Sequence, residues 1–460
     1  MDLIKLLAGK YLLKDELPLE KTHIQQLLDK KFLIQSQAIS KTFFHTICNR
    51  CGNKKQYLFG TMNCSQCQKT HVYCRNCIET GRAMECSRMY EWTGPEPTWL
   101  EQKNPCRWEG ELTPAQTKAA EKIKQTTIQN KEILIWAVCG AGKTEMLFPG
   151  ITTALQQGKR VCLATPRSDV VRELMPRFRS AFPQTDIEAL YANSKQKTGI
   201  GQLILSTTHQ LIRYKHAFDV MIIDEIDAFP FHQDPSLHRL ADRACKPTSS
   251  RIYLTATPRK QLKKKVQQKT LPTAFVPIRF HGYPLPVPIP KLEWNLRKKI
   301  TQKKVPSTLS SFLKLRNHKR QLLIFVPTVH QLSYVEDLLK EYFSSLTTVH
   351  AEDEDRKEKI EAFRAKKYKA MVTTTILERG VTFPSVDVVI LDAGHHVFDE
   401  AAIVQIAGRA GRSHADPTGD VLLIHQGLTE AIKQAIRHIE SMNKRAKNES
   451  TYQPIFTEEK

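Results

Sequence analysis

The stretch EILIWAVCGAGKTE, residues 132–145, decides the fold, because an apolar run leads directly into a glycine-rich turn ending in lysine and threonine. The β-branched residues of the run are typical of a buried strand in a parallel sheet. Such a turn surrounds phosphate oxygens with backbone N–H groups at the start of the next helix. The lysine can reach the outer phosphates and the threonine hydroxyl can bind magnesium. We therefore predict an ATP and Mg²⁺ site at Cys139, Gly140, Ala141, Gly142, Lys143 and Thr144.

The loop departs from the usual pattern at Ala137, which stands where the first glycine belongs. An alanine has less backbone freedom than a glycine, but Gly140 and Gly142 keep the turn flexible. Taken alone, the stretch could also be a glycine-rich turn without a ligand. The rest of the sequence has to decide between these two interpretations.

A second apolar run, VMIIDEID at 220–227, ends in carboxylates. A carboxylate at a strand end can hold magnesium, and its neighbour can activate the attacking water. We predict Asp224 as the metal ligand and Glu225 as the general base. Two acids could instead only cap the next helix, but the phosphate loop upstream favours the catalytic interpretation.

Two arginines in QIAGRAGR, residues 405–412, complete the predicted site. Arg409 and Arg412 are three residues apart, and on a helix such residues share a face. Arginine stabilises charge on a transferring phosphoryl group without losing its proton. Alone, the pair would indicate a basic surface patch; with the phosphate loop, it predicts a site that a second lobe closes over ATP.

Short apolar runs alternate with longer amphipathic segments such as 168–182, which is typical of βα units in parallel sheets. We predict an α/β protein with two RecA-like lobes after a small N-terminal zinc-binding module. The other expected strands lie at 160–165, 202–207, 220–224, 251–257, 321–327, 346–351, 369–375, 386–393 and 420–425. The proline-rich run HGYPLPVPIP, residues 281–290, cannot continue a helix or a central strand and indicates a linker. The expected division is 1–44 (N-terminal segment), 45–95 (zinc-knuckle module), 96–280 (first lobe), 281–300 (proline-rich and basic linker) and 301–460 (second lobe).

The 460 residues carry 69 Lys and Arg against 47 Asp and Glu, a formal net charge of +22. Such a charge indicates a polyanionic partner, most often nucleic acid, although a basic inert surface is the simpler alternative. The N-terminus has no signal-peptide core and no run is apolar enough for a membrane span. We expect a cytosolic protein with reduced thiols.

Six of the eleven cysteines form three Cys-x-x-Cys pairs between residues 48 and 77. Two such pairs make a tetrahedral zinc site, and all-cysteine sites are usually structural. The six candidate ligands exceed the four that one ion needs; a second ion would also require His71, His45 or Cys86. The alternatives for one ion are the first and third pairs, or the first two. The candidates are Cys48, Cys51, Cys64, Cys67, Cys74 and Cys77.

The ordered motifs resemble those of superfamily-two helicases, from about Leu112 to His425. The resemblance implies that Gln116 of LTPAQ reads adenine and that Gly380 of TTILERGVT lies at the nucleotide. It also implies DNA contact or coupling at Thr165, Arg167, Thr207, Thr255, Thr257, Thr328 and Thr374.

Three positions separate the chain from the RNA-acting DEAD-box branch: Ile226, the TAT at 255–257 and Gln405. Glu378 and Arg379 of ILERG instead resemble the DNA-acting branch of replication-restart and recombination helicases. That branch implies phosphate-based grip on single-stranded DNA, with strong salt dependence. The basic runs 258–269 and 295–304 are near the expected path of the strand, or are solvated faces.

With its zinc knuckles ahead of the lobes and its YCRNC and ETGR signatures, the whole chain resembles the ComFA family of late competence proteins. The resemblance implies a single-strand-DNA-stimulated ATPase that draws transforming DNA inward at the cytoplasmic face of the membrane. It implies the partners ComFC and DprA and the membrane channel ComEC, and leaves self-association open. The competing hypotheses are a replication-restart or recombination-type helicase, and a zinc-dependent DNA-binding scaffold whose ATPase only switches conformation.

Overall fold

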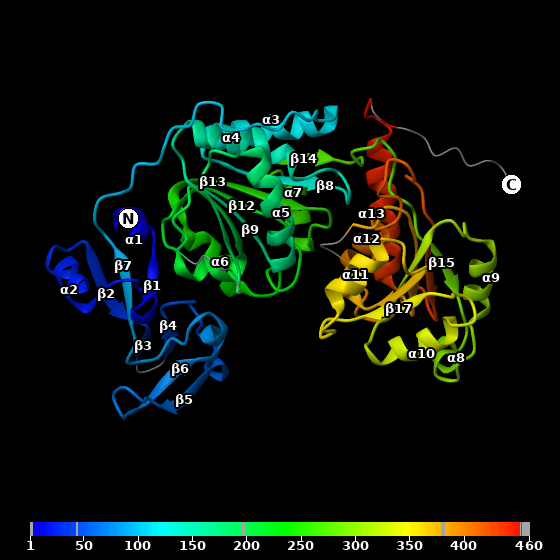
Figure 1. The fold of residues 1–460 in the computed structure, drawn as a ribbon, viewed down its shortest axis with the longest axis horizontal. Helices are drawn as coiled ribbons and strands as arrows, with labels where there is room; N and C mark the ends of the chain where they lie inside the picture. The colour runs from blue at the N-terminus through cyan, green and yellow to red at the C-terminus, as the bar shows by residue number, and fades with distance from the viewer. Residues whose placement is uncertain are drawn as a thin grey trace.

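The computed structural model describes residues 3–42, 45–192, 194, 198–378, 382–450 and 452. An N-terminal module, a first α/β lobe and a second α/β lobe lie in chain order along the long axis of the molecule (Figure 1). None of the helices in the described ranges has both the length and the apolar character that a membrane crossing requires.

The N-terminal module, residues 3–92 apart from 43–44, is built on a three-stranded antiparallel sheet of order β1-β7-β2. Gln37 of β2 pairs with Arg88 of β7, so residues 38–87 leave and re-enter this sheet at one place. We call these residues, as far as they are described, the cysteine insertion; it contains two hairpins, β3–β4 and β5–β6. The elements are α1 (Leu3–Leu7), β1 (Tyr11–Leu13), α2 (Lys21–Asp29), β2 (Leu33–Gln37), β3 (Ile39–Lys41), β4 (Thr46–Cys48), β5 (Phe59–Asn63), β6 (Thr70–Cys74) and β7 (Arg88–Trp92).

The first lobe is a seven-stranded parallel sheet of order β10-β11-β9-β12-β13-β8-β14. Its strands are apolar on both faces because both faces are covered. In β12, Val220 and Ile222 pack with α3, α4 and α5, whereas Met221 and Ile223 pack with α6 and the N-terminal module. The strands are β8 (Glu132–Ala137), β9 (Val161–Thr165), β10 (Ile187–Leu190), β11 (Leu203–Thr207), β12 (Phe218–Ile223), β13 (Cys245–Thr255) and β14 (Thr273–Val276). The helices are α3 (Pro114–Gln129), α4 (Phe148–Gln156), α5 (Ser168–Ala181), α6 (Pro235–Ala244) and α7 (Lys260–Gln267).

The second lobe repeats this plan with a six-stranded parallel sheet of order β15-β20-β19-β16-β18-β17. Alternate residues again divide between two cores, with α11, α12 and α13 on one face and α8, α9 and α10 on the other. The strands are β15 (Ile289–Leu292), β16 (Gln321–Phe325), β17 (Leu346–Val349), β18 (Ala370–Thr373), β19 (Val386–Leu391) and β20 (Val421–His425). The helices are α8 (Leu296–Thr301), α9 (Ser307–Leu315), α10 (His330–Leu339), α11 (Arg356–Arg364), α12 (Glu400–Ala407) and α13 (Glu430–Ala446). The α/β class with two RecA-like lobes is confirmed.

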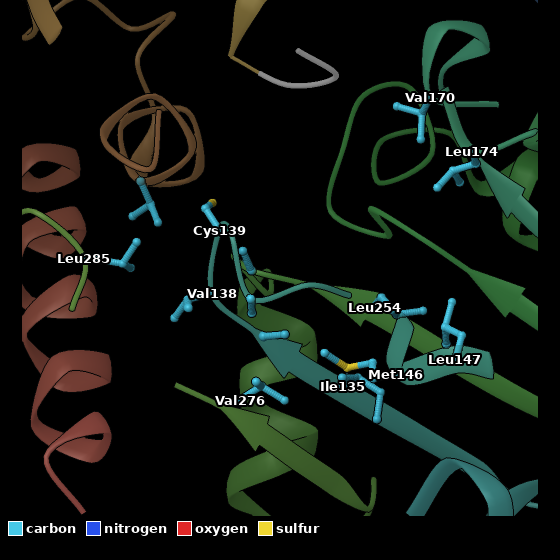
Figure 2. Packing of buried hydrophobic residues seen from close by; sticks show 14 of the residues in the cluster. Ile135, Val138, Cys139, Met146, Leu147, Val170, Leu174, Leu254, Val276 and Leu285 are labelled. Atoms are coloured by element: carbon cyan, nitrogen blue, oxygen red, sulfur yellow. The ribbon is translucent and has the colours of Figure 1, made fainter. Parts of the chain in front are cut away.

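The predicted linker, 281–300, is only partly irregular, because it includes β15 and α8 of the second lobe. Pro290 fits in β15 because this strand lies at the edge of its sheet, where a missing N–H donor is tolerated. Leu285, before β15, exchanges two hydrogen bonds with the side chain of Asn443 on α13. Figure 2 shows Leu285 beside the C-terminal helix, in the same buried cluster as Val138 and Cys139 of the phosphate loop. The connection between the lobes is therefore packed against both of them.

Candidate active site and metal centre

A cavity of about 580 Å³ lies where the two lobes meet and is lined by side chains from both. The first lobe contributes the phosphate loop, Asp224 and Glu225, and the second contributes Arg409 and Arg412. The structure thus brings together all five residues that the sequence nominated for catalysis, since Lys143 also lines the cavity.

The phosphate loop follows β8 as the sequence predicts, and its turn depends on two glycines. Gly140 and Gly142 have φ angles of 79° and 67°, in the left-handed region that glycine adopts without strain. Ala137 is the last residue of β8, where it is paired with Val276 of β14. Its backbone is that of an ordinary strand, so the missing first glycine causes no strain in this loop.

Gln116, which the resemblance assigns to adenine, lies beside the phosphate loop at the start of α3. Its amide nitrogen donates to the carbonyl oxygens of Ala141 (2.9 Å) and Gly142 (3.3 Å). Its amide oxygen accepts from the N–H of Thr113, the N-cap residue of α3. The side chain therefore connects the helix cap to the loop, and it lines the cavity with Trp108.

The two acids lie directly after β12 and are held in different ways. Asp224 is half-buried, and the partial loss of hydration raises its pKa to about 6, although the nearby charge of Lys143 acts in the opposite direction. Its carboxylate accepts a hydrogen bond of 2.8 Å from the N–H of Glu225. Glu225 has a φ of 53°, an unusual conformation for a residue with a side chain. Both carboxyl groups face the cavity that contains Lys143.

The two arginines lie on the turn after α12, not on a helix as predicted, because the helix ends at Ala407 and Gly408 is its C-cap. Arg409 is 1% exposed, and its Nε donates to the carbonyl oxygen of Glu378 at 3.1 Å. Its two terminal nitrogens have no hydrogen-bond partner among the described residues. Burial, followed by the charge of Arg412, lowers the pKa of Arg409 well below its usual value.

Arg412 is half-buried and donates to the carbonyl oxygen of Gly408 (2.9 Å) and to the hydroxyl of Thr382 (3.3 Å). Gly408 itself lies against the phosphate loop: a Cβ atom added to it would lie 2.4 Å from the Cβ of Cys139. The second lobe can approach the loop this closely only because residue 408 has no side chain.

Arg279 does not line the cavity, but it joins the two lobes behind it, a role that the sequence did not reveal. It follows β14 and uses all of its N–H donors on five carbonyl oxygens, which belong to Tyr283, Pro284, Ala410, Gly411 and Pro417. The next residue, Phe280, donates its N–H to the carbonyl oxygen of Gly140 at 3.0 Å. The segment 279–280 therefore contacts the phosphate loop on one side and, on the other, the turn after α12 that carries Arg409 and Arg412. A single arginine before a proline-rich stretch carries no sequence signal for such a role.

A chain of hydrogen bonds leads to the second lobe from Asp227, which lies two residues after Glu225. Asp227 accepts from the hydroxyls of Thr255 and Thr257, and Thr257 accepts from the amide of Gln405 at 3.4 Å. Gln405 in turn accepts from the thiol of Cys139 at 3.0 Å. Thr255 and Thr257, two of the seven residues predicted for DNA contact or coupling, are therefore internal groups that join the first lobe to the second.

The other residues predicted to contact DNA are scattered around the cleft. Arg167 is paired with Asp169 (2.7 Å) and donates to the carbonyl oxygen of Ile376 in the second lobe (3.3 Å). The remaining four lie at or just beyond the carboxyl ends of strands, where Thr165 and Thr207 are buried and Thr328 and Thr374 half-buried. Gly380 and Arg379 lie outside the described residues.

Part of the two basic runs is engaged within the protein. Lys263 of α7 pairs with Glu400 of α12 at 2.6 Å, and Arg259 pairs with Asp399 at 2.6 Å. Lys303 pairs with Asp337 at 2.7 Å. Lys260, Lys264, Lys265 and Lys269 are exposed. The first run therefore both holds the lobes together and presents positive charge to solvent.

The cysteine insertion contains a buried quartet formed by the first and third Cys-x-x-Cys pairs. The thiols of Cys48, Cys51, Cys74 and Cys77 all lie within 4.8 Å of one another. The Sγ atoms of Cys48 and Cys77 are 3.7 Å apart. The alternative that uses the first two pairs does not fit, because the β5–β6 hairpin carries Cys64 and Cys67 to its far end. His45 belongs to no cysteine cluster in the described structure.

Both sites fit the groups that the sequence implies. Four thiolates about 3.8 Å apart are what tetrahedral Zn²⁺ with Zn–S bonds of about 2.3 Å requires, and the observed 3.7 Å agrees. In the cleft, the terminal nitrogens of Arg409 are buried donors without partners among the described residues, and Asp224 is a half-buried carboxylate near Lys143. A polyphosphate with a divalent cation would satisfy both kinds of group.

Comparison with known protein families divides the chain into three parts. Residues 1–91 match the competence protein ComFA N-terminal domain, residues 109–260 match the type III restriction enzyme res subunit, and residues 304–414 match the helicase conserved C-terminal domain. The helicase families cover the lobes that line the cavity, and the ComFA family covers the N-terminal module.

Two solved structures show the same arrangement of lobes at low sequence identity. Dbp5 of S. cerevisiae bound to RNA and ADP BeF3 has a TM-score of 0.50 and 16% identity, over 72% of this chain and 91% of that one. The Mycobacterium smegmatis helicase Lhr bound to ssDNA and AMP-PNP has a TM-score of 0.51 and 18% identity, over 72% of this chain and 48% of that one. At these identities the likeness establishes the fold alone.

Relatives with far higher identity match nearly the full length. Competence protein ComFA of Bacillus subtilis is 42% identical over 97% of this chain and 96% of its own length. Competence protein ComFA of Streptococcus pneumoniae is 37% identical over 84% of this chain and 91% of its own. The chain therefore belongs to the ComFA family of competence proteins, which places an ATP-hydrolysing, helicase-like enzyme behind a cysteine-rich N-terminal domain.

Proposed function

We propose that this chain is an ATP-driven translocase on single-stranded DNA that powers the uptake of transforming DNA into the cytoplasm during natural competence. One observation carries the proposal: Lys143 of one lobe and Arg409 of the other line the same cavity, and the terminal nitrogens of Arg409 have no partner among the described residues. A site divided between two lobes changes its contacts when ATP binds and is hydrolysed, so it can move the lobes relative to each other.

Each residue of the site has a role that its chemistry supports. Lys143 binds the outer phosphates, while Thr144 and Asp224 hold magnesium, which neutralises charge that develops on the phosphates. Glu225 takes a proton from the attacking water. Arg409 and Arg412 donate hydrogen bonds to the transferring phosphoryl group, where a guanidinium stays protonated even when buried.

The hydrogen bonds between the lobes connect this chemistry to movement. Gln405 contacts both Cys139 on the phosphate loop and Thr257, which is bonded to Asp227 beside the acids. A change in the loop or near the acids therefore acts on the second lobe through Gln405. We assign coupling to Thr255, Thr257 and Gln405, and strand contact to groups at the strand ends, including Thr328 and Thr374.

The net charge of +22 favours a polyanion as the substrate. We propose that single-stranded DNA is held by its phosphates with little sequence preference, and that it stimulates ATP hydrolysis. The family relationship further supports association with ComFC and DprA, and with the channel ComEC at the inner face of the membrane.

We propose that the buried cysteine quartet binds a structural zinc ion. Cys48→Ser should then lower both the zinc content and the free energy of unfolding.

The first experiment compares ATP turnover without nucleic acid and with single-stranded DNA, RNA or duplex DNA at several salt concentrations. We expect single-stranded DNA to stimulate turnover most, and stimulation to fall steeply as salt rises. Equal turnover with all of these ligands would contradict the proposal. Robust unwinding of forked duplexes would instead favour a replication-restart type of helicase.

A second experiment tests the motor against a scaffold. Lys143→Ala should abolish ATP turnover and DNA uptake in cells while the purified variant stays folded. Lys131→Ala, an exposed lysine just before β8, is the matched control and should leave both unchanged. Uptake that survives Lys143→Ala would mean that hydrolysis does not drive DNA movement.

A further inference from the structure

A second cluster of metal-binding side chains lies at the far end of the β5–β6 hairpin. The thiols of Cys64, Cys67 and Cys86 all lie within 4.8 Å of one another. The Sγ atoms of Cys64 and Cys86 are 3.8 Å apart, and the Nε2 atom of His71 lies 3.0 Å from the Sγ atom of Cys67. Three thiols therefore converge at one place, separate from the buried quartet, and the imidazole of His71 lies beside one of them.

The turn that carries Cys64 and Cys67 has the same backbone hydrogen bonds as the first zinc knuckle. In the first knuckle, the N–H of Gly52 donates to the carbonyl oxygen of Cys48, and the N–H of Cys48 donates to the carbonyl oxygen of Asn53. In the second, the N–H of Gln68 donates to the carbonyl oxygen of Cys64, and the N–H of Cys64 donates to the carbonyl oxygen of Lys69.

The residue after each pair, Gly52 or Gln68, also has a left-handed φ, of 74° and 58°. A glutamine adopts this conformation at some energetic cost, so the shape of the turn is maintained against the preference of its sequence. A bound cation gives a reason for that shape, because both thiolates of such a turn point at one ion.

A carboxylate, the kind of group that often accompanies a metal-bound imidazole, lies beside His71. Its other nitrogen, Nδ1, lies 3.7 Å from a carboxylate oxygen of Glu85, and Glu85 is held by Lys41 at 3.1 Å. A carboxylate on the far side of a ligating histidine fixes the ring orientation and makes it a better ligand. Glu85 also accepts from the N–H of Val72, so it is positioned by the hairpin itself.

We propose that Cys64, Cys67, Cys86 and His71 bind a second Zn²⁺ ion. Three thiolates and one imidazole form one of the usual structural zinc sets, and an S···S distance of about 3.8 Å is expected for tetrahedral zinc. Each thiol loses its proton to solvent on binding, and His71 binds through Nε2 as the neutral ring. The family domain covers these residues, but the ion is inferred here from their geometry alone.

The second ion would hold a part of the insertion that the first does not reach. The quartet joins the end of β4 to the end of β6, near the first lobe. The second cluster instead joins the tip of the β5–β6 hairpin to the segment that leads into β7 through Cys86. The two ions would therefore fix the hairpin at both of its ends.

The test is the zinc content of the full-length protein, measured by plasma mass spectrometry after purification without chelators. We expect two zinc ions per chain in the wild type and one in the double variant Cys64→Ser, Cys67→Ser. Cys106→Ser, which removes a cysteine outside both clusters, should retain two. A wild-type value of one that the double variant leaves unchanged would overturn the proposal, as would two ions in the double variant.

Cobalt substitution keeps the test decisive if the double variant folds poorly. Two spectroscopically distinct Co²⁺ sites are expected in the wild type, one with four thiolates and one with three thiolates and a nitrogen. His71→Ala and Glu85→Gln should weaken only the second site, by about 10- to 100-fold in metal affinity. A single cobalt site that neither substitution affects would show that the second cluster does not bind metal.

Discussion

Arg279 and Arg409 are both 1% exposed and lie on segments that touch each other at the centre of the cleft, yet they differ in how they are bonded. All five N–H donors of Arg279 are used on carbonyl oxygens, two in the linker, two in the turn after α12 that carries Arg409, and one at Pro417. Arg409 uses only Nε, and its terminal nitrogens have no partner among the described residues.

A buried guanidinium is costly unless its donors are paired, because it has lost its hydration. Arg279 meets this condition within the protein, so its role is structural. Arg409 does not meet it in the described structure, and the oxygens of a phosphoryl group would supply what is missing. The difference separates a residue that connects the lobes from one that acts on the ligand.

Arg409→Ala should have the largest effect on activity and little effect on stability. We expect kcat for ATP hydrolysis to fall by about 10³-fold or more, the range measured for arginines that stabilise phosphoryl transfer. The midpoint of thermal unfolding should stay the same or rise, because an unpaired buried charge is removed. Steady-state kinetics and calorimetry check the two parts, and a large loss of stability would show that Arg409 is structural after all.

Arg279→Ala should show the opposite balance. It removes a hydrogen bond from each of five carbonyl oxygens in a buried region, of which Gly411 keeps a partner in His281, and we expect the free energy of unfolding to fall by about 3 kcal/mol. Urea unfolding of the full-length protein measures this loss. Arg279→Lys, which keeps the charge with fewer donors, should restore part of it, whereas an unchanged unfolding midpoint in Arg279→Ala would contradict the structural role.

Asp224 extends the comparison to the first lobe, because it is a half-buried charge at the ligand site. Its pKa of about 6 lies above the ordinary 3.8, so the folded protein keeps the proton longer than the unfolded chain does. The contribution of Asp224 to stability should therefore fall as pH rises from about 4 to about 6, by up to about 3 kcal/mol, while carboxylates with lowered pKa values, such as Glu293 and Glu400, act in the opposite direction. Asp224→Asn should remove that fall and be the more stable protein at pH 7 without magnesium, as urea unfolding at a series of pH values can show. Equal pH dependence in the two proteins would contradict the half-buried charge.

Gly408→Ala tests how closely the second lobe must approach the phosphate loop, and it does so by adding a single methyl group. The added Cβ would lie 2.4 Å from the Cβ of Cys139, which cannot move without the phosphate loop. We expect ATP turnover to fall by about 10- to 100-fold, the equivalent of the 1–3 kcal/mol typical of overpacking. Gly427→Ala, whose added Cβ would meet nothing within 4 Å, is the control. Cys139→Gly in the Gly408→Ala protein should restore part of the turnover, and no recovery would mean that the contact is not the cause.

The sequence predicts the lobes and the first-lobe half of the site well because each motif follows its own strand. Asp224 and Lys143 come directly after buried apolar runs, and the carboxyl ends of parallel strands meet at one edge. Arg279 and Gly408 could not be predicted, because their roles depend on how closely the second lobe approaches the first. The end of α12 was missed although Gly408 is a common helix terminator. Which cysteines lie in the buried quartet and which at the far end of the β5–β6 hairpin depends on the length of that hairpin. The spacing of the Cys-x-x-Cys pairs does not show this length.

The cysteine insertion begins and ends at paired residues, since Gln37 lies opposite Arg88 and the N–H of Ala38 donates to the carbonyl oxygen of Ser87. If the cysteine insertion were replaced by a two-residue turn, that turn could join Gln37 of β2 directly to Arg88 of β7, and the three-stranded sheet would stay intact. Loss of metal should accordingly unfold residues within the cysteine insertion, while the sheet formed by β1, β7 and β2 stays folded. The insertion also packs against α6 of the first lobe, so the loss of metal should be felt at that contact as well as within the insertion.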